Sequence, residues 1–119
     1  MKKEYRDDIE VRYDILKVCD DPDENKPTII SFISRTANVS HYLAVEHINV
    51  LGECGLIDSY RHYLTEYDHN NDGTYKIAFR TTLKGKEFLR AYEGLENSLT
   101  KVRDFDYKQA PENDKSRNN

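Results

Sequence analysis

The polar run Asp68-His69-Asn70-Asn71-Asp72-Gly73 is the stretch whose residue types come nearest to a metal-binding motif, because it matches the first half of an EF-hand calcium loop. Such a loop needs a bidentate Glu six residues after its glycine, and Phe79 stands at that position. The flanking residues are rich in Tyr, Ile, Phe and Thr, which favours strands over helices. We therefore interpret the run as the polar tip of a hairpin, with Asp72-Gly73 as its tight reversal.

The other residues of the types that can bind metals or carry out catalysis do not have the spacing of a known metal-binding or catalytic motif. Cys19 and Cys54 are far apart and form no CxxC pair, and the four histidines complete no zinc pattern with them. The acidic run 20–24 could attract a cation, but a solvated loop explains it better. Phosphate-cradling glycine loops, GxSxG motifs and paired carboxylates are absent from the sequence. We expect no metal, no other cofactor and no enzymatic activity, with both cysteines packed as reduced, buried thiols of an intracellular protein.

Apolar spacing predicts three helices and a hairpin in the first part of this 119-residue chain, which is long enough for one domain. A first helix is expected over residues 4–19 and a second from Thr28, its N-cap, to about residue 38. A third helix, 40–53, is capped by Ser40 and ended by Gly55 at the C′ position. The hairpin is expected over residues 57–81.

A last helix is expected over residues 82–105, because apolar residues recur there at alternating spacings of four and three, as in a coiled coil. These residues, the α-helical seam, are Phe88, Tyr92, Leu95, Leu99 and Val102. Leu83 and Leu89 lie off the seam, and we expect them to pack on the chain's own core. An isolated helix gains little in water, so the seam needs a partner surface. We favour a second copy of the chain over folding back onto the same domain, although Gly94 and Ser98 weaken the coil.

The charge is distributed unevenly along the chain. Its net value is −4, but residues 1–25 hold five basic and nine acidic side chains, whereas residues 74–103 hold seven basic and three acidic ones. A local positive face is therefore possible. The longest apolar runs are a few residues, against about 20 for a membrane-spanning helix, so we expect no membrane contact. Residues 106–119 have little to bury and are expected to form a disordered polar tail.

Three pieces of sequence together resemble small archaeal winged helix-turn-helix DNA-binding proteins that dimerise through a C-terminal coiled-coil helix. They are the turn Asn38-Val39-Ser40, the exit Leu51-Gly52-Glu53-Cys54-Gly55-Leu56-Ile57, and the later stretch beginning Thr82-Leu83-Lys84-Gly85. The resemblance covers about residues 9–103. It implies an α+β, mostly α, fold: a winged helix-turn-helix domain over residues 1–81, a dimerisation helix over 82–105 and the polar tail over 106–119.

The same resemblance implies that a homodimer binds double-stranded DNA, with helix 40–53 in the major groove and the 57–81 hairpin as the wing. It implies base contacts from the solvent side of that helix, by Ser40, His41, Tyr42, Glu46 and Asn49. It implies phosphate or wing contacts from Lys26, Thr28, Arg35, Arg61, His62, Lys76 and Arg80. His47 is expected to pack in the core, and Tyr60, Tyr63, Tyr67 and Tyr75 to stack across the hairpin.

Two departures from the resemblance refine the expected function. The wing is longer than in the smallest such proteins, and the acidic net charge differs from the basic charge of the chromatin-coating members. We therefore expect a specific transcriptional regulator, cytoplasmic and nucleoid-associated, with no small-molecule ligand evident. The alternative is a winged-helix module that docks proteins through the same helix and wing. A positive stripe across helix 40–53 and the wing would favour DNA, and a neutral or acidic one would favour a protein partner.

Overall fold

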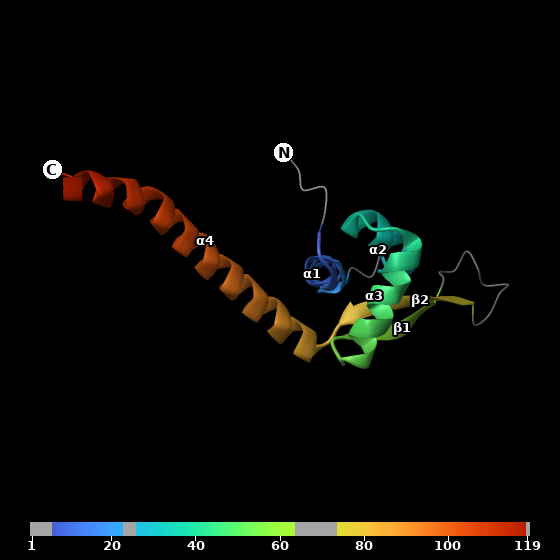
Figure 1. Cartoon of the computed structure of the whole chain (residues 1–119). Coiled ribbons are helices and arrows are strands. Elements are labelled where there is room, and N and C mark those ends of the chain that lie inside the picture. Colours follow the sequence, from blue (N-terminus) through green and yellow to red (C-terminus); the bar gives the residue numbers. More distant parts are fainter. Residues whose placement is uncertain (1–5, 23–25, 64–73, 119) are drawn as a thin grey trace. The chain divides into compact units, whose positions relative to one another are not determined.

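The computed structural model describes residues 6–22, 26–63 and 74–118, with the backbone alone for residues 106–118. Four helices and one antiparallel hairpin make up these residues, which confirms the mostly α, α+β class (Figure 1). The elements are α1 (Asp8–Cys19), α2 (Ile30–Ala37), α3 (His41–Glu53), β1 (Ile57–Tyr63), β2 (Tyr75–Thr81) and α4 (Leu83–Asn118). The chain divides into two compact units, residues 1–89 and residues 90–119, and α4 contributes to both.

The first unit is built around one apolar core in which α1 is the central helix. Asp7 caps α1 by accepting from the backbone N–H of Glu10 at 2.8 Å, and the Glu10 carboxylate accepts in return from the N–H of Asp7 at 3.1 Å. This reciprocal pair satisfies two N–H groups that the helix leaves open at its start. The core of the unit consists of Val11, Ile15, Leu16, Cys19, Ile33, Ala37, Ile48, Leu51, Ile57 and Leu89. Leu89 thus packs on the chain's own core, as predicted.

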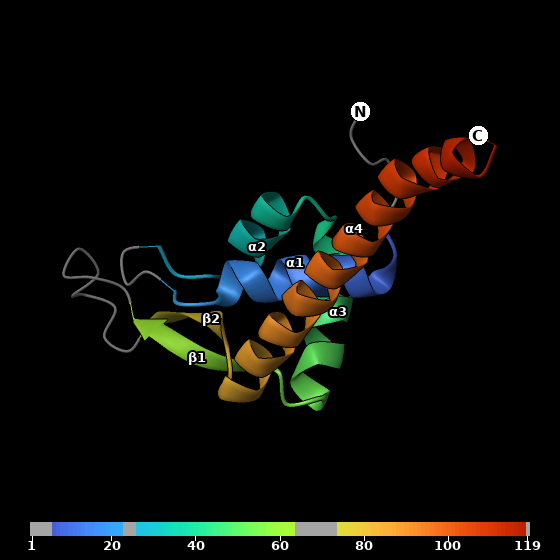
Figure 2. The ribbon, with the colours of Figure 1, turned by 90° about the vertical axis from the view of Figure 1, so that its left-hand side faces the viewer.

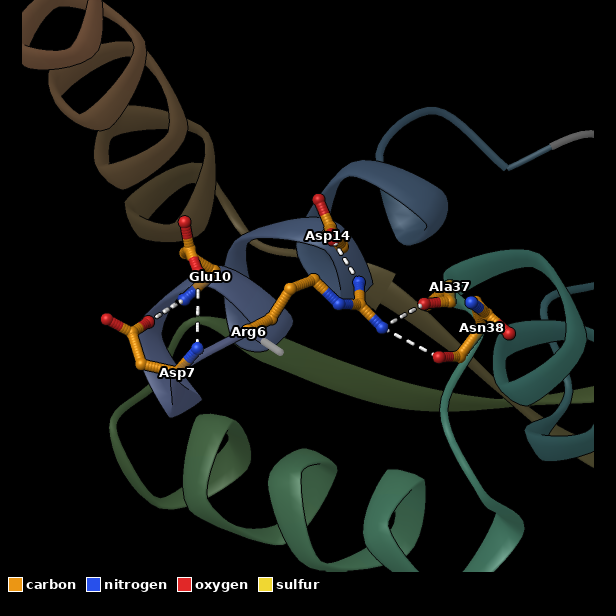
Figure 3. Close-up of polar contacts among 6 residues, drawn as sticks. All are labelled: Arg6, Asp7, Glu10, Asp14, Ala37 and Asn38. Atoms are coloured by element: carbon orange, nitrogen blue, oxygen red, sulfur yellow. Dashed lines mark hydrogen bonds and ion pairs between the residues drawn. The ribbon is translucent and has the colours of Figure 1, made fainter. Parts of the chain in front are cut away.

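The turn between α2 and α3 is held by a left-handed residue and by an arginine from the N-terminal segment. Asn38, the C-cap of α2, has φ 58° and ψ 57°, a conformation that Asn tolerates better than most residues. The Arg6 guanidinium donates to the carbonyls of Ala37 at 2.9 Å and Asn38 at 2.6 Å, and it also pairs with the carboxylate of Asp14 on α1 (Figure 3). Arg6 therefore ties the turn to α1.

Both predicted ends of α3 are confirmed, whereas the predicted start of α2 is wrong. The Ser40 hydroxyl accepts from the N–H of Leu43 at 3.1 Å, and Gly55 has φ +77° just after the helix. α2 begins at Ile30 rather than at a Thr28 cap, because the Thr28 hydroxyl donates instead to the carbonyl of Phe79 on β2. The N-cap position passes to Ile29, whose side chain makes no capping hydrogen bond.

β1 and β2 form the expected antiparallel hairpin, in which Ile57 pairs with Thr81 and Tyr63 with Tyr75 (Figure 2). Beside them, the backbone N–H of Phe79 donates to the carbonyl of Thr28 at 3.0 Å. The Thr81 hydroxyl donates to the carbonyl of Leu16 at 2.8 Å and so fastens β2 to α1. The expected reversal at Asp72-Gly73, the calcium-like run 68–73 and Tyr67 lie outside the described residues.

Three expectations about burial and length need correction. Cys54 is exposed, because it directly follows α3 at the surface, whereas Cys19 is buried as expected. Leu83 is 70% exposed rather than packed on the core, because it is the first residue of α4 and precedes the turns that reach the core. α4 extends to Asn118, so the predicted end of the last helix at residue 105 is wrong.

Candidate nucleic-acid interface

α3 has one buried side and one solvent side, and the two sides divide its residues by type. Ala44, Ile48 and Leu51 are at most 4% exposed and fix the helix against the core. The five predicted base-facing residues, Ser40, His41, Tyr42, Glu46 and Asn49, are all exposed. All five of these hydrogen-bonding side chains therefore lie at the surface of the domain, and their contact with bases stays a prediction.

Tyr42 and Glu46 lie one helical turn apart on this solvent side and interact with each other. The hydrogen bond to Glu46 raises the pKa of the Tyr42 phenol, and the Glu46 charge raises it further. The phenol therefore stays protonated near neutral pH. Glu46 is the only charged side chain in the middle of the exposed face of α3.

His47 lies on the opposite side of α3, where it is 6% exposed, as expected for a packed histidine. The Arg12 Nε donates to the His47 Nδ1 at 3.1 Å, so Nδ1 acts as an acceptor and the ring is neutral. Burial lowers the pKa of His47 and the Arg12 charge lowers it further, against smaller opposing effects of Asp8 and Glu46. Arg12 is a residue that the sequence reasoning missed, since nothing near it in the sequence indicates a partner on α3.

Six of the seven predicted phosphate or wing residues have surface positions, and Thr28 does not. Lys26, Arg35, Arg61, Lys76 and Arg80 are exposed and His62 is half-buried. Thr28 is 2% exposed with its hydroxyl on the carbonyl of Phe79, so it is a structural residue and leaves the phosphate set. In the sequence, Thr28 follows a proline and precedes an apolar run. That pattern fits a buried threonine as well as a helix cap, so the sequence cannot distinguish the two.

The basic residues of the hairpin divide between its two faces. Side chains alternate along a strand, and the pairs His62 with Lys76 and Asp58 with Arg80 place Lys76 and Arg80 on one face. Arg61 is on the other face, across from Ile77. The hairpin therefore has a basic face and a second face where a single cation lies among apolar side chains.

Aromatic rings hold both hairpin arginines in place. The Arg80 guanidinium lies over the Tyr60 ring and that of Arg61 over the Tyr75 ring, each 4.7 Å from the ring centroid. Tyr75 also meets Tyr63 edge to face at 5.5 Å, which confirms the stacking predicted for that pair. Such cation–π contacts restrict the arginine rotamers while leaving their N–H donors exposed to solvent.

The charge across α3 is neutral to acidic rather than positive. α3 contains no Lys or Arg, and Glu46 and Glu53 are its exposed acids. A groove of about 470 Å³ between α3 and the hairpin is bordered by Glu53 and Asp58, together with Asn49 and Ser59. Exposed apolar side chains complete this face, with Tyr42 70%, Leu43 42% and Val50 37% exposed. The basic residues lie outside α3, at the end of α2 and on the hairpin.

The seam of α4 is shared between the two units. Phe88 is partly buried against the core of the first unit, so this side chain contributes to the packing of its own domain. In the second unit, Leu95 is 57%, Leu99 38% and Val102 56% exposed, and Tyr92 is partly buried. Phe105, 62% exposed, is a further apolar residue that the strict four-and-three spacing missed.

No group of three His, Cys, Asp or Glu side chains that could hold a metal ion occurs within residues 6–22, 26–63 and 74–105. Among the described residues, no helix combines the length and apolar character needed to cross a membrane.

One protein family has this arrangement of three helices, the second and third joined by a tight turn, followed by a hairpin. The winged helix-turn-helix family matches residues 5–100. The chain belongs to this winged helix-turn-helix family. No curated protein matches its sequence. The narrower likeness to archaeal members stays a prediction.

Solved structures show the same fold at low sequence identity. A mutant of MepR from S. aureus superposes with a TM-score of 0.60 at 11% identity, covering 97% of this chain and 75% of its own. A mutant of ZitR from Lactococcus lactis gives 0.54 at 15% identity, covering 91% and 68%. FabT from Streptococcus pneumoniae, in complex with DNA, gives 0.53 at 18% identity, covering 92% and 71%.

Proposed function

We propose that this winged helix-turn-helix protein is a cytoplasmic, nucleoid-associated transcriptional regulator that binds specific double-stranded DNA as a homodimer. α3 enters the major groove and the β1–β2 hairpin is the wing. The observation that carries the proposal is the exposed, hydrogen-bonding side of α3 on a helix whose other side is fixed in the core. The FabT structure, which contains DNA, supports the same use of the fold.

The proposal assigns different roles to the charged residues outside α3 and to the residues of α3. Phosphates attract cations and repel anions, and they supply most of the sequence-independent affinity. The exposed cations Lys26, Arg35 and Arg80 lie outside α3, before α2, at the end of α2 and on β2, whereas α3 itself carries uncharged and acidic groups. Affinity then comes from the flanks and specificity from α3.

The homodimer is supported by the apolar side chains of α4. Leu95, Leu99 and Val102 recur at four and three residues and are exposed in the described chain. A second copy would cover them in a symmetric coiled coil. Two copies related by a two-fold axis present two α3 helices and match a palindromic DNA site.

Salt-dependent binding to the DNA upstream of the protein's own gene tests the proposal. Fluorescence anisotropy should show binding at low salt and a steep loss of affinity as salt is added. Arg80→Gln should lower the salt slope by about one unit, because one phosphate contact is lost. Lys101→Gln on α4 removes the same charge from the second unit and should leave the slope unchanged. Absence of binding by the wild-type chain at low salt contradicts the proposal.

The second candidate is a protein-docking module, which the exposed apolar residues and the acidic charge of α3 favour. Tyr42, Leu43 and Val50 would then form the centre of a protein interface. In that case Tyr42→Ala would abolish partner binding, and DNA affinity would be absent at every salt concentration.

A further inference from the structure

Glu46 stands out on α3 because it places a negative charge in the middle of the face proposed to approach DNA. It is exposed, and the helix from His41 to Glu53 offers no Lys or Arg to neutralise it. DNA is a polyanion, so its phosphates repel the Glu46 carboxylate whatever the DNA sequence is. Glu46 is therefore tolerated only where a base offers a hydrogen-bond donor to its carboxylate.

The major groove offers two such donors, the N4 amino group of cytosine and the N6 amino group of adenine. On adenine the N7 acceptor lies beside N6 and repels a carboxylate. On cytosine the neighbouring position of the same base is a C–H group, which is no acceptor. The chemistry of an acceptor-only, negatively charged group thus selects cytosine.

Tyr42 precedes Glu46 by one helical turn, and both side chains lie on the solvent side. Glu46 raises the pKa of the Tyr42 phenol, so the two groups interact and the phenol is available as a donor to the carboxylate. A carboxylate has two oxygens, so one can accept from Tyr42 while the other stays available. Asn49 follows three residues later, about 4.5 Å along the helix axis, on the same solvent side. That rise is close to one base-pair step of about 3.4 Å.

We propose that Glu46, positioned by Tyr42, is the specificity-determining residue that requires a cytosine in each half-site, next to a base pair contacted by Asn49. This inference rests on the proposed DNA-binding function. The proposed effect of Glu46 differs from general DNA affinity, because Glu46 weakens binding only to DNA sites that lack a cytosine at that position.

Random-site selection with the full chain, followed by anisotropy on the selected site, tests the inference. The wild-type protein should enrich one cytosine per half-site and should bind about tenfold more weakly when thymine, which presents an O4 acceptor, replaces it. Glu46→Gln should bind both sites within about threefold of each other and should lose the cytosine from its own selection. Tyr42→Phe should reduce the discrimination while the melting temperature stays the same.

Glu53→Gln is the matched control, since it removes the same charge from the same helix at its C-terminal end. It should keep the cytosine preference. Equal discrimination by wild-type, Glu46→Gln and Glu53→Gln would overturn the assignment of Glu46 while leaving DNA binding intact. Failure of the wild-type chain to enrich any sequence would overturn both this inference and the proposed function.

Discussion

The Arg12 side chain donates from Nε to Nδ1 of the buried His47 across 3.1 Å and so joins α1 to the helix that carries the candidate base contacts. Since both groups would be cations if His47 were protonated, the contact exists only with a neutral imidazole. The position of α3 is therefore linked to the protonation state of one buried histidine.

Stability should fall as the pH drops below about 6.5, the ordinary pKa of histidine. The folded pKa of His47 is lower than the unfolded one, mainly because of burial and then of Arg12. At a pH between the folded and the unfolded pKa of His47, unfolding therefore takes up a proton. The contribution of the neutral His47 to the unfolding free energy is complete above the unfolded pKa. It is lost as the pH falls through the folded pKa. Urea unfolding between pH 7.5 and pH 5 measures it.

Two histidine variants separate this effect from general acid unfolding. His47→Gln keeps an acceptor for Arg12 but does not titrate, so its unfolding free energy should depend less on pH. His41→Gln, at the exposed start of the same helix, should follow the wild-type curve. Parallel curves for wild-type and His47→Gln would disprove the link.

Substitution of Gly85 should be far more damaging than substitution of Gly94, although both glycines are in α4. A Cβ on Gly85 would overlap the carbonyl oxygen of Leu56 and the methyl group of Thr81, whereas a Cβ on Gly94 meets nothing within 4 Å. We expect Gly85→Ala to lose about 1–3 kcal/mol or more of stability through overpacking. Gly94→Ala should gain roughly 0.5–1 kcal/mol of helix stability. Thermal melts and helical circular dichroism measure both, and similar melts for the two variants would contradict the packing at Gly85.

Charge placed on the α4 seam should dissociate the proposed dimer. Leu99→Glu would put a carboxylate into the apolar seam, which is costly to bury, and should weaken self-association at least about tenfold. Leu83→Glu, at a 70% exposed position outside the seam, is the control and should leave association unchanged. Sedimentation equilibrium measures the mass. A wild-type chain that sediments as a monomer would refute the proposed coiled coil.

The two cysteines should react with a thiol reagent at very different rates. Burial raises the pKa of Cys19 to about 12, so its reactive thiolate is scarce as well as inaccessible. Cys54 is exposed just after α3. Native protein should therefore be labelled once, at Cys54, and a second time only after denaturation. The Cys54→Ser variant should take up no label until it unfolds, and rapid native labelling of that variant would place Cys19 at the surface.

The fold was predictable because its local signals agree with its tertiary packing. Ser40 and Gly55 mark the ends of α3 by chemistry that acts within a few residues, and the aromatic and β-branched residues of the hairpin indicate its two strands. Long-range partners were not predictable. Arg6 contacts Ala37 across 31 positions, and Thr28 binds Phe79 across 51, with no nearby pattern to indicate either contact.

The candidate site was predictable as a side of a helix but not as a charge distribution. Helical periodicity alone places Tyr42, Glu46 and Asn49 opposite the buried residues of α3. Whether the basic residues Arg61 and Arg80 share a surface depends on the register of the strands, which the tertiary structure sets. The sequence likewise could not show that an aromatic ring restrains each of these arginines.

The contacts between Thr28 and Phe79 have a consequence for how the protein behaves at high concentration. A strand at the margin of a small sheet exposes unpaired peptide groups that can recruit the same strand of another molecule. Thr28 occupies both the N–H and the carbonyl of Phe79, so β2 is closed to such recruitment at its midpoint. Loss of the Thr28 hydroxyl would free the carbonyl of Phe79, although the backbone carbonyl of residue 28 would still hold the Phe79 N–H. The freed carbonyl could then accept from a strand of another molecule, and the chain would become more prone to aggregation before it lost its fold.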